Sequence, residues 1–209
     1  LKQVAPEWWR RQVIYQPQEP ALFNASIEEN LRINNPEIDG SVLNSIIDVC
    51  GLRKFLDESQ EGFDTPIIDN GWRLSEGIRR RISLARALTT NGQLAVIDEP
   101  TESLDADGCA AVHEILGTLV KQDKTIILMS HDGKLVKGPH TLLDLNEKPV
   151  PTINKVDDGY ANTDSSSANL APEQLATEDK ATAFIGGAAG LNSDQAVNSI
   201  LNEKSANND

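Results

Sequence analysis

The chain has 209 residues, of which 39% are hydrophobic, and carries a formal net charge of -13 at pH 7. This length is compatible with one globular domain and a polar appendage. The strong negative charge argues against a nucleic-acid partner and against an anionic membrane surface, since both interactions require a basic field. Any anionic ligand must therefore be held by local geometry.

A short β-strand is the first predicted element, in the sequence RRQVIYQPQ at residues 10–18. Its β-branched residues favour a strand, and Pro17 and Pro20 then end it. The chain opens at Leu1, within a segment that already leads into this strand. We therefore expect the chain to be a fragment whose beginning is missing.

Two stretches with apolar residues at helical spacing follow, SIEENLRINN at 26–35 and GSVLNSIIDVCGLRKFLDES at 40–59. These should form a helical layer. The residues available for one broad apolar face of the second stretch are Val42, Ile46, Ile47, Val49 and Leu52. Cys50 and Cys109 lie in separate helix-like stretches without metal-ligand spacing, which predicts two buried free thiols.

Strand and helix alternate in the next part of the chain. A helix is predicted from about 77 to 88, the apolar run QLAVIDEP at 93–100 follows, and a second helix is predicted from about 107 to 122. The apolar run KTIILMSH comes next, and HTLLDL is a plausible further strand. This alternation predicts an α/β fold in which a parallel sheet is connected by right-handed crossovers.

The composition changes beyond about residue 149 to Ser, Asn, Ala, Asp and Thr, without a core-forming period. We interpret residues 149–209 as a disordered acidic tail that follows a domain at 1–148. The sequence NSDQAVNSILNEK at 192–204 could form a short amphipathic helix. An unattached, fraying helix is favoured there over a docking peptide.

Ionisable residues follow both central apolar runs. Asp98 and Glu99 end the first run and His131 ends the second. Because ligands of open α/β sheets bind at the carboxyl ends of the strands, we expect these three residues to share one edge. Asp98 could hold Mg²⁺, Glu99 could orient or deprotonate a water, and His131 could bind a γ-phosphate. A turn cap at Asp98 and a strand-end role for His131 are the alternatives, but the ordered set indicates nucleotide hydrolysis.

Several motifs in order resemble those of one family. LSEGIRRRISLARAL at 74–88 resembles the signature motif, commonly LSGGQ, and LAVIDEP at 94–100 resembles Walker B with its catalytic glutamate, Glu99. TESLDAD resembles the D-loop and LMSHD the switch-histidine loop. Over about residues 1–145 the chain therefore resembles the ATP-binding domain of ATP-binding cassette (ABC) proteins, in the exporter branch. The resemblance implies a partial P-loop NTPase-like core with a helical signature subdomain.

Further site residues are implied by this resemblance. YQPQEPALFNASIEENL at 15–31 resembles the Q-loop region, which places Gln18 next to Mg²⁺ or water. Ser75, Gly77 and Asp105 would bind nucleotide, while Asp98 and Gln18 would hold the metal. DTPIIDNG at 64–71 lies where exporters carry a Thr-x-Val-Gly-Glu-x-Gly segment that contacts the membrane domain.

The chain also departs from the family pattern. The phosphate-binding loop G-x-x-x-x-G-K-[ST] does not occur in it, and the pair Gly133-Lys134 lacks the surrounding residues. In the family that loop lies upstream of the segment that resembles VAPEWWRRQVIYQPQ. In the signature, Glu76 replaces a glycine, and Ile78 replaces the glutamine. The neighbouring Arg79, Arg80 and Arg81 could neutralise Glu76, although about half of this run should be a solvated helix face.

The function implied by the resemblance is ATP hydrolysis that powers an exporter, with ATP and Mg²⁺ as cofactors. A second ABC domain in a head-to-tail dimer and a fused or separate transmembrane domain would be the partners, at the cytoplasmic face of a membrane. The alternatives are a regulatory cassette with a degenerate site and a soluble, non-transport ABC ATPase. By loose resemblance, bacterial type I protein or peptide secretion fits better than drug or lipid export.

We predict that this chain alone neither binds ATP tightly nor hydrolyses it. Without the backbone amides and the lysine of a phosphate-binding loop, little is present to hold the triphosphate. Titration with a fluorescent ATP analogue tests this directly. Saturable binding in the micromolar range would contradict the prediction.

Overall fold

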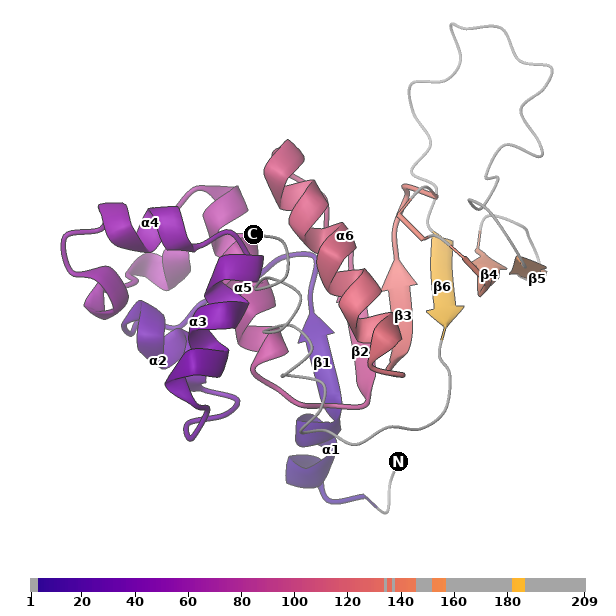
Figure 1. Cartoon of the computed structure of the whole chain (residues 1–209), viewed down its shortest axis with the longest axis horizontal. Helices are drawn as coiled ribbons and strands as arrows, with labels where there is room; N and C mark the ends of the chain where they lie inside the picture. The colour runs from indigo at the N-terminus through magenta and orange to yellow at the C-terminus, as the bar shows by residue number, and fades with distance from the viewer. Residues whose placement is uncertain (1–3, 134, 137, 146–151, 157–181, 187–209) are drawn as a thin grey trace, which may run out of the picture.

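The computed structural model describes residues 4–133, 135–136, 138–145, 152–156 and 182–186 (Figure 1). Its central element is a six-stranded sheet with the strand order β1-β2-β3-β6-β4-β5. A group of short helices lies beside β1, and the long helix α6 runs across the sheet (Figure 1). This arrangement agrees with the predicted α/β fold, but the sheet is mixed and not purely parallel, because β4, β5 and β6 form antiparallel pairs.

The three predicted parallel strands are present as β1 (Val13–Gln16), β2 (Leu94–Asp98) and β3 (Thr125–Met129). β2 lies in the middle and pairs in parallel with both neighbours. Alternate side chains of these strands, such as Ile14, Ile97 and Leu128, are buried. The helices that follow β1 and β2 therefore cover this face of the sheet.

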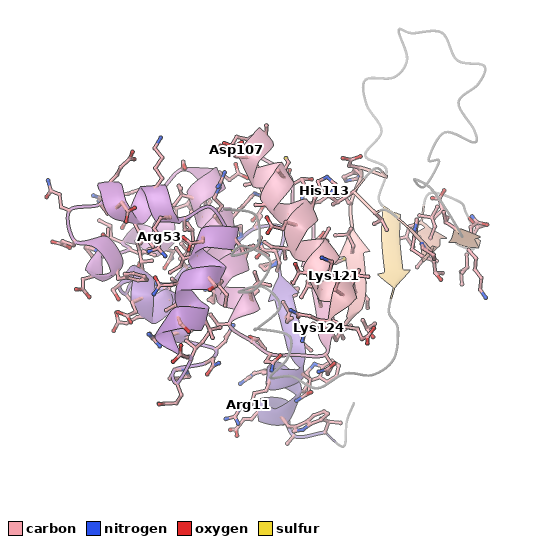
Figure 2. The ribbon with its side chains drawn as sticks, viewed as in Figure 1. Arg11, Arg53, Asp107, His113, Lys121 and Lys124 are labelled. Carbon is pink, nitrogen blue, oxygen red and sulfur yellow. The ribbon has the colours of Figure 1, made fainter. Side chains whose placement is uncertain are left out.

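Two helices provide the main packing against the strands, α5 (Glu76–Leu88) and α6 (Ala106–Lys121). Both agree closely with the helices predicted from about 77 and 107. α6 connects β2 to β3 and runs antiparallel to them, so its first turn lies at the carboxyl ends of the strands. Figure 2 shows Asp107 at this end of α6 and Lys121 at the other.

The helical layer predicted upstream consists of α2 (Ile27–Arg32), α3 (Gly40–Val49) and α4 (Arg53–Glu58). Two 3₁₀ turns follow, η1 (Gly62–Asp64) and η2 (Asp69–Gly71). The stretch at 40–59 is thus divided into two helices. The break comes at Gly51, whose φ of 66° lies in the left-handed region that glycine adopts without steric cost.

One helix was not predicted. α1 (Pro6–Gln12) precedes β1 and includes residues 10–12 of the segment interpreted as strand. Pro6 stands in its first turn, where the missing N–H costs no hydrogen bond, but none of its residues is buried. Because the apolar pattern of a core-facing helix is absent, periodicity could not reveal it.

Beyond β3 the sheet continues with β4 (His140–Asp144), β5 (Thr152–Val156) and β6 (Thr182–Gly186). β4 confirms the strand predicted in HTLLDL. For the two segments that form β5 and β6, the expectation of a tail without regular structure is corrected, because β5 pairs with β4 and β6 pairs with β3 and β4. Backbone hydrogen bonds can stabilise strands this short, and these bonds do not require an alternating apolar pattern in the sequence. The amphipathic segment at 192–204 and Lys134 lie outside the described residues.

Both cysteines are free thiols, but their environments differ. Cys50 is 1% exposed, as predicted, and burial raises the pKa of its thiol to about 12. Cys109 is only partly buried, which corrects the prediction of two buried thiols. Within the described part of the chain, no helix is both long and apolar enough to cross a membrane.

We predict that Cys50 resists alkylation in the folded chain. Thiolate is the reactive form, and burial suppresses both its formation and access to it. Iodoacetamide at a mildly alkaline pH, followed by peptide mass spectrometry, should modify Cys109 much faster than Cys50. The urea-unfolded chain is the control and should react at both positions. Equal labelling of Cys50 in the folded and unfolded chains would contradict the burial.

Candidate functional site

The carboxyl ends of β2 and β3 bring the predicted acidic and histidine residues to one edge. Asp98 pairs in register with Met129, and the backbone N–H of Glu99 donates to the Met129 carbonyl at 2.9 Å. The chain then turns sharply, because Glu99 has a φ of 41° in the left-handed region. Glu99 thereby leaves the strand direction and faces the end of β3.

Glu99 and His131 are in direct contact. The His131 Nε2 lies 3.3 Å from Glu99 Oε1, and the backbone N–H of His131 donates to the same oxygen at 3.0 Å. The Ser130 hydroxyl donates to the other Glu99 oxygen at 3.4 Å. The Glu99 side chain is only 13% exposed, whereas that of His131 is 46% exposed. The expected convergence of Glu99 and His131 is therefore present in the structure.

The electrostatics of Glu99 suit a proton acceptor. Burial raises the pKa of its carboxyl group, and the neighbouring His131 and Ser130 offset this only in part. A carboxylate with a raised pKa is a stronger base than an exposed one. The open side of His131 leaves this pair accessible from solvent.

Residues 74–78, which resemble the signature motif and are called the signature turn below, lie at the start of α5. Ser75 is the N-cap residue, and its hydroxyl oxygen accepts from the backbone N–H of Ile78 at 3.3 Å. The hydroxyl proton is not used in this bond, so it can be donated to an anion in front of the helix. Gly77 lies beside the loop that follows β2: a Cβ placed on it would lie 3.5 Å from the Ser103 carbonyl oxygen. The two loops are thus adjacent.

Glu76, the unusual residue of this turn, is paired with Arg80 one helical turn later. Arg80 Nη2 and Nε lie 2.9 and 3.1 Å from the same Glu76 oxygen. The hydrogen bond from Arg80 lowers the pKa of Glu76, which therefore carries its charge within an ion pair. The expected neutralisation of Glu76 is confirmed for Arg80. Arg80 is only 4% exposed, so it does not belong to a solvated helix face.

Asp105 contacts both the backbone of α6 and an arginine of α5. It is the N-cap residue of α6 and accepts from the backbone N–H of Gly108 at 2.8 Å. It also forms an ion pair with Arg81, which donates to the Gly51 carbonyl at 3.2 Å. Arg81 therefore joins the end of α3 to α5 and to the start of α6.

Gln18 follows β1 and lies near the same loop. Its side-chain Nε2 donates to Glu102 Oε2 at 3.3 Å, and Arg80 Nη2 donates to that same oxygen at 2.8 Å. Sequence reasoning did not single out Glu102, and it treated Arg80 only as one of three arginines. The sequence could not indicate that Glu102 contacts Gln18 and Arg80, because these residues lie far apart in the chain.

An exposed apolar surface lies beside α2 and η2. Phe23, Ile68 and Trp72 are 53%, 44% and 70% exposed. Their two segments are adjacent, because the backbone N–H of Asn70 donates to the Asn24 side chain at 2.8 Å. We call Phe23, Ile68 and Trp72 the apolar surface below.

A cavity in the described part of the chain lies away from these residues. It has a volume of about 490 Å³ and is lined by residues of α3 and α6 and by Lys124, and none of the predicted site residues contributes to it. Figure 2 shows Lys124 near the lower end of α6, away from the carboxyl ends of the strands. Among the described residues, no cluster of three or more His, Cys, Asp or Glu could hold a metal ion by itself.

Comparison with known proteins gives consistent results. Residues 1–102 match the family described as ABC transporter. The chain is 30% identical over 179 residues to ABC transporter B family member 1 of Dictyostelium discoideum, covering 86% of this chain and 20% of that protein. It is 32% identical over 138 residues to the alpha-hemolysin translocation ATP-binding protein HlyB of Escherichia coli O157:H7, covering 66% and 19%.

The chain is also similar to a further relative and to part of a solved structure. The chain is 34% identical over 153 residues to the multidrug resistance protein pgp-1 of Caenorhabditis elegans, covering 73% of this chain and 12% of that protein. A bacterial Atm1-family ABC exporter with ATP bound has a TM-score of 0.47 and 24% identity, covering 57% of this chain and 23% of that one. The chain thus spans 20% or less of the length of the curated relatives named here.

We predict that Asp105→Ala destabilises the chain more than Asp105→Asn. Asparagine keeps the helix cap and loses only the ion pair with Arg81, whereas alanine loses both. The melting temperature should fall by about 2–4 °C for alanine. Asp107→Ala, in the same helical turn but outside the cap position, is the control and should have a smaller effect.

This difference should depend on pH. The backbone N–H of Gly108 and the nearby Arg81 lower the pKa of Asp105 in the folded chain. The contribution of the charged carboxylate is therefore present above the ordinary aspartate range and is lost as the pH falls through the lowered pKa. Equal melting temperatures of wild type and both variants at neutral pH would contradict the assigned role.

Proposed function

Residues 1–102 belong to the ABC transporter family, and from that premise we propose that the chain is part of the ATP-hydrolysing cassette of an ABC exporter. The observation that supports this most strongly is the contact of Glu99 with His131, at 3.3 Å, where adjacent parallel strands end. A base and a hydrogen-bond donor in contact at the carboxyl edge of an α/β sheet suit hydrolysis of a phosphoanhydride.

In this proposal Glu99 is the general base. Its largely buried carboxylate accepts a proton from the water that attacks the γ-phosphate, and its raised pKa favours that transfer. His131 donates a hydrogen bond to the γ-phosphate as charge redistributes toward the transition state. The contacts of Glu99 with Ser130 and the His131 backbone hold its carboxylate in place.

The residues proposed for Mg²⁺ are Asp98 and Gln18. Mg²⁺ prefers oxygen ligands and usually takes only one or two from the protein, with phosphate oxygens and water completing the shell. Asp98 ends β2, and the Gln18 amide donates through its nitrogen to Glu102, which leaves its oxygen for a cation. This donor set fits Mg²⁺, which when bound would neutralise charge on the phosphates.

Ser75 and Gly77 form the proposed phosphate sensor of the signature turn. In a head-to-tail dimer with a second ABC domain, this helix start would face the nucleotide held by the partner. Pairing with Arg80 keeps Glu76 from acting as an uncompensated negative charge there. Asp105, at the start of α6, belongs to the loop that we propose to lie at the same dimer interface.

The apolar surface is the proposed contact with the membrane domain. Phe23 and Trp72 are large, exposed side chains on two segments that the Asn24–Asn70 hydrogen bond joins. Burial of such side chains by a partner would provide most of the contact energy. This places the cassette at the cytoplasmic face of the membrane in the proposal.

For the transported cargo we propose a protein or peptide. Relatives at comparable identity carry the names alpha-hemolysin translocation ATP-binding protein and leukotoxin export ATP-binding protein. A regulatory cassette with a weakened site is the second candidate, because Glu76 stands in the signature turn. The retained contact of Glu99 with His131 favours an active site over that alternative.

The first experiment is to sequence the DNA upstream of the Leu1 codon and to express the protein encoded by the whole reading frame. We expect a phosphate-binding loop G-x-x-x-x-G-K-[ST] and apolar segments of membrane length, and we expect ATP hydrolysis that requires Mg²⁺. A stop codon or an initiator directly upstream would contradict the proposal in favour of the regulatory cassette.

We predict that Glu99→Gln in that protein lowers the turnover number by at least about 100-fold. Glutamine preserves the shape of the side chain but cannot accept the proton, so ATP-dependent dimerisation should remain. Steady-state ATPase assays and size-exclusion chromatography with ATP measure the two effects. Glu114→Gln, on the exposed side of α6, is the control. Unchanged turnover in Glu99→Gln would remove Glu99 from the role of base.

A further inference from the structure

One oxygen atom of Glu102 joins two parts of the chain that are far apart in sequence. Glu102 Oε2 accepts from Gln18 Nε2 at 3.3 Å and from Arg80 Nη2 at 2.8 Å. Gln18 follows β1, Glu102 follows β2, and Arg80 lies on α5. The contact therefore links three segments that surround the carboxyl ends of the parallel strands.

Arg80 is held more firmly than an ordinary surface arginine. Its side chain is 5% exposed, whereas those of Glu76 and Glu102 are 45% and 46% exposed. Its guanidinium group also donates to the Glu99 carbonyl oxygen at 3.3 Å. A planar group with several fixed donors keeps these acceptors in one arrangement, which a flexible lysine could not reproduce.

The loop that carries Glu102 has unusual backbone angles. Glu99 and Ser103 have φ values of 41° and 58°, both in the left-handed region that side chains disfavour. The backbone N–H of Glu102 donates to the Glu99 carbonyl at 3.3 Å, the same oxygen that Arg80 contacts. Arg80 thus stabilises the turn and the carboxylate on it together.

The contact with Glu102 determines which end of the Gln18 amide faces the carboxylate. A side-chain amide has a donor end and an acceptor end, whereas an ionised carboxylate can only accept. Glu102 therefore selects the nitrogen of Gln18 and turns the Gln18 oxygen away from itself. Without Glu102, either end of the amide could occupy the same position.

We propose that Glu102, held by Arg80, is a positioning residue that fixes the amide orientation of Gln18 so that its oxygen is presented as a ligand. The orientation itself follows from the geometry. Its consequence for Mg²⁺ rests on the function proposed above. Neighbouring groups that hold a ligand in one orientation are a general feature of metal sites.

The orientation is tested on the chain by NMR spectroscopy, without nucleotide or metal. The Gln18 side-chain amide signals are assigned by their loss in Gln18→Ser. In the wild type we expect nuclear Overhauser contacts between the Gln18 amide protons and Glu102. In Glu102→Gln these contacts should weaken, because the new amide can pair with either end of Gln18, and the Gln18 signals should move toward those of the exposed Gln60. Arg80→Lys should give an intermediate change.

Two controls separate this effect from a general disturbance of the fold. Asp48→Asn removes a different ion pair, the one between Asp48 and Arg53 on α3 and α4, and should leave the Gln18 signals unchanged. Backbone amide spectra report whether each variant remains folded. Gln18 signals that stay in place in a folded Glu102→Gln variant would overturn the proposal.

The consequence for the metal is tested in the protein encoded by the whole reading frame. Glu102→Gln should raise the Mg²⁺ concentration required for half-maximal ATPase activity, while Asp48→Asn should not. An unchanged Mg²⁺ requirement would overturn the positioning role even if the NMR result held. Absence of ATPase activity in the wild type would instead contradict the proposed function and leave the measured orientation of Gln18 intact.

Discussion

The register between β2 and β3 is the constraint on which the candidate site depends. Asp98 lies opposite Met129, and the Glu99 N–H bonds to the Met129 carbonyl, so the strands end together. A shift of one residue would turn alternate side chains to the opposite face and expose Ile97. Burial of that side chain, which is 1% exposed, therefore fixes the position of Glu99 relative to His131 as well.

Charge is balanced locally, even though the chain as a whole is strongly acidic. Arginines near the start of α5 are unfavourable with the helix dipole and would be costly to bury alone. Arg80 and Arg81, both largely buried, have acidic partners: Arg80 contacts Glu76 and Glu102, and Arg81 contacts Asp105. The pairs of Arg80 with Glu102 and of Arg81 with Asp105 join α5 to the loop after β2. The same contacts that compensate buried charge thus also position that loop.

Local patterns predicted the elements that have a periodic apolar face or a buried apolar run. They located β2, β3, α5 and α6 within a few residues, and the strand-end rule predicted that Glu99 and His131 would meet. The contact of Arg80 with Glu102 could not be predicted, because it depends on how α5 packs beside a turn with left-handed residues. β6 also could not be predicted, since its partners are strands reached only through the folded sheet.

The geometry of Glu76 explains how a carboxylate can stand at the helix start that we propose to face an anion. Glu76 is the first residue of α5, and its partner Arg80 lies four residues farther along the helix. Such a pair draws the carboxylate along the helix surface, toward the carboxyl end and away from the free N–H groups of the first turn. The Ser75 hydroxyl proton, and the first-turn N–H groups that Ser75 does not cap, then remain available in front of the helix. The replacement of glycine by glutamate therefore changes the charge around the turn more than it changes access to it.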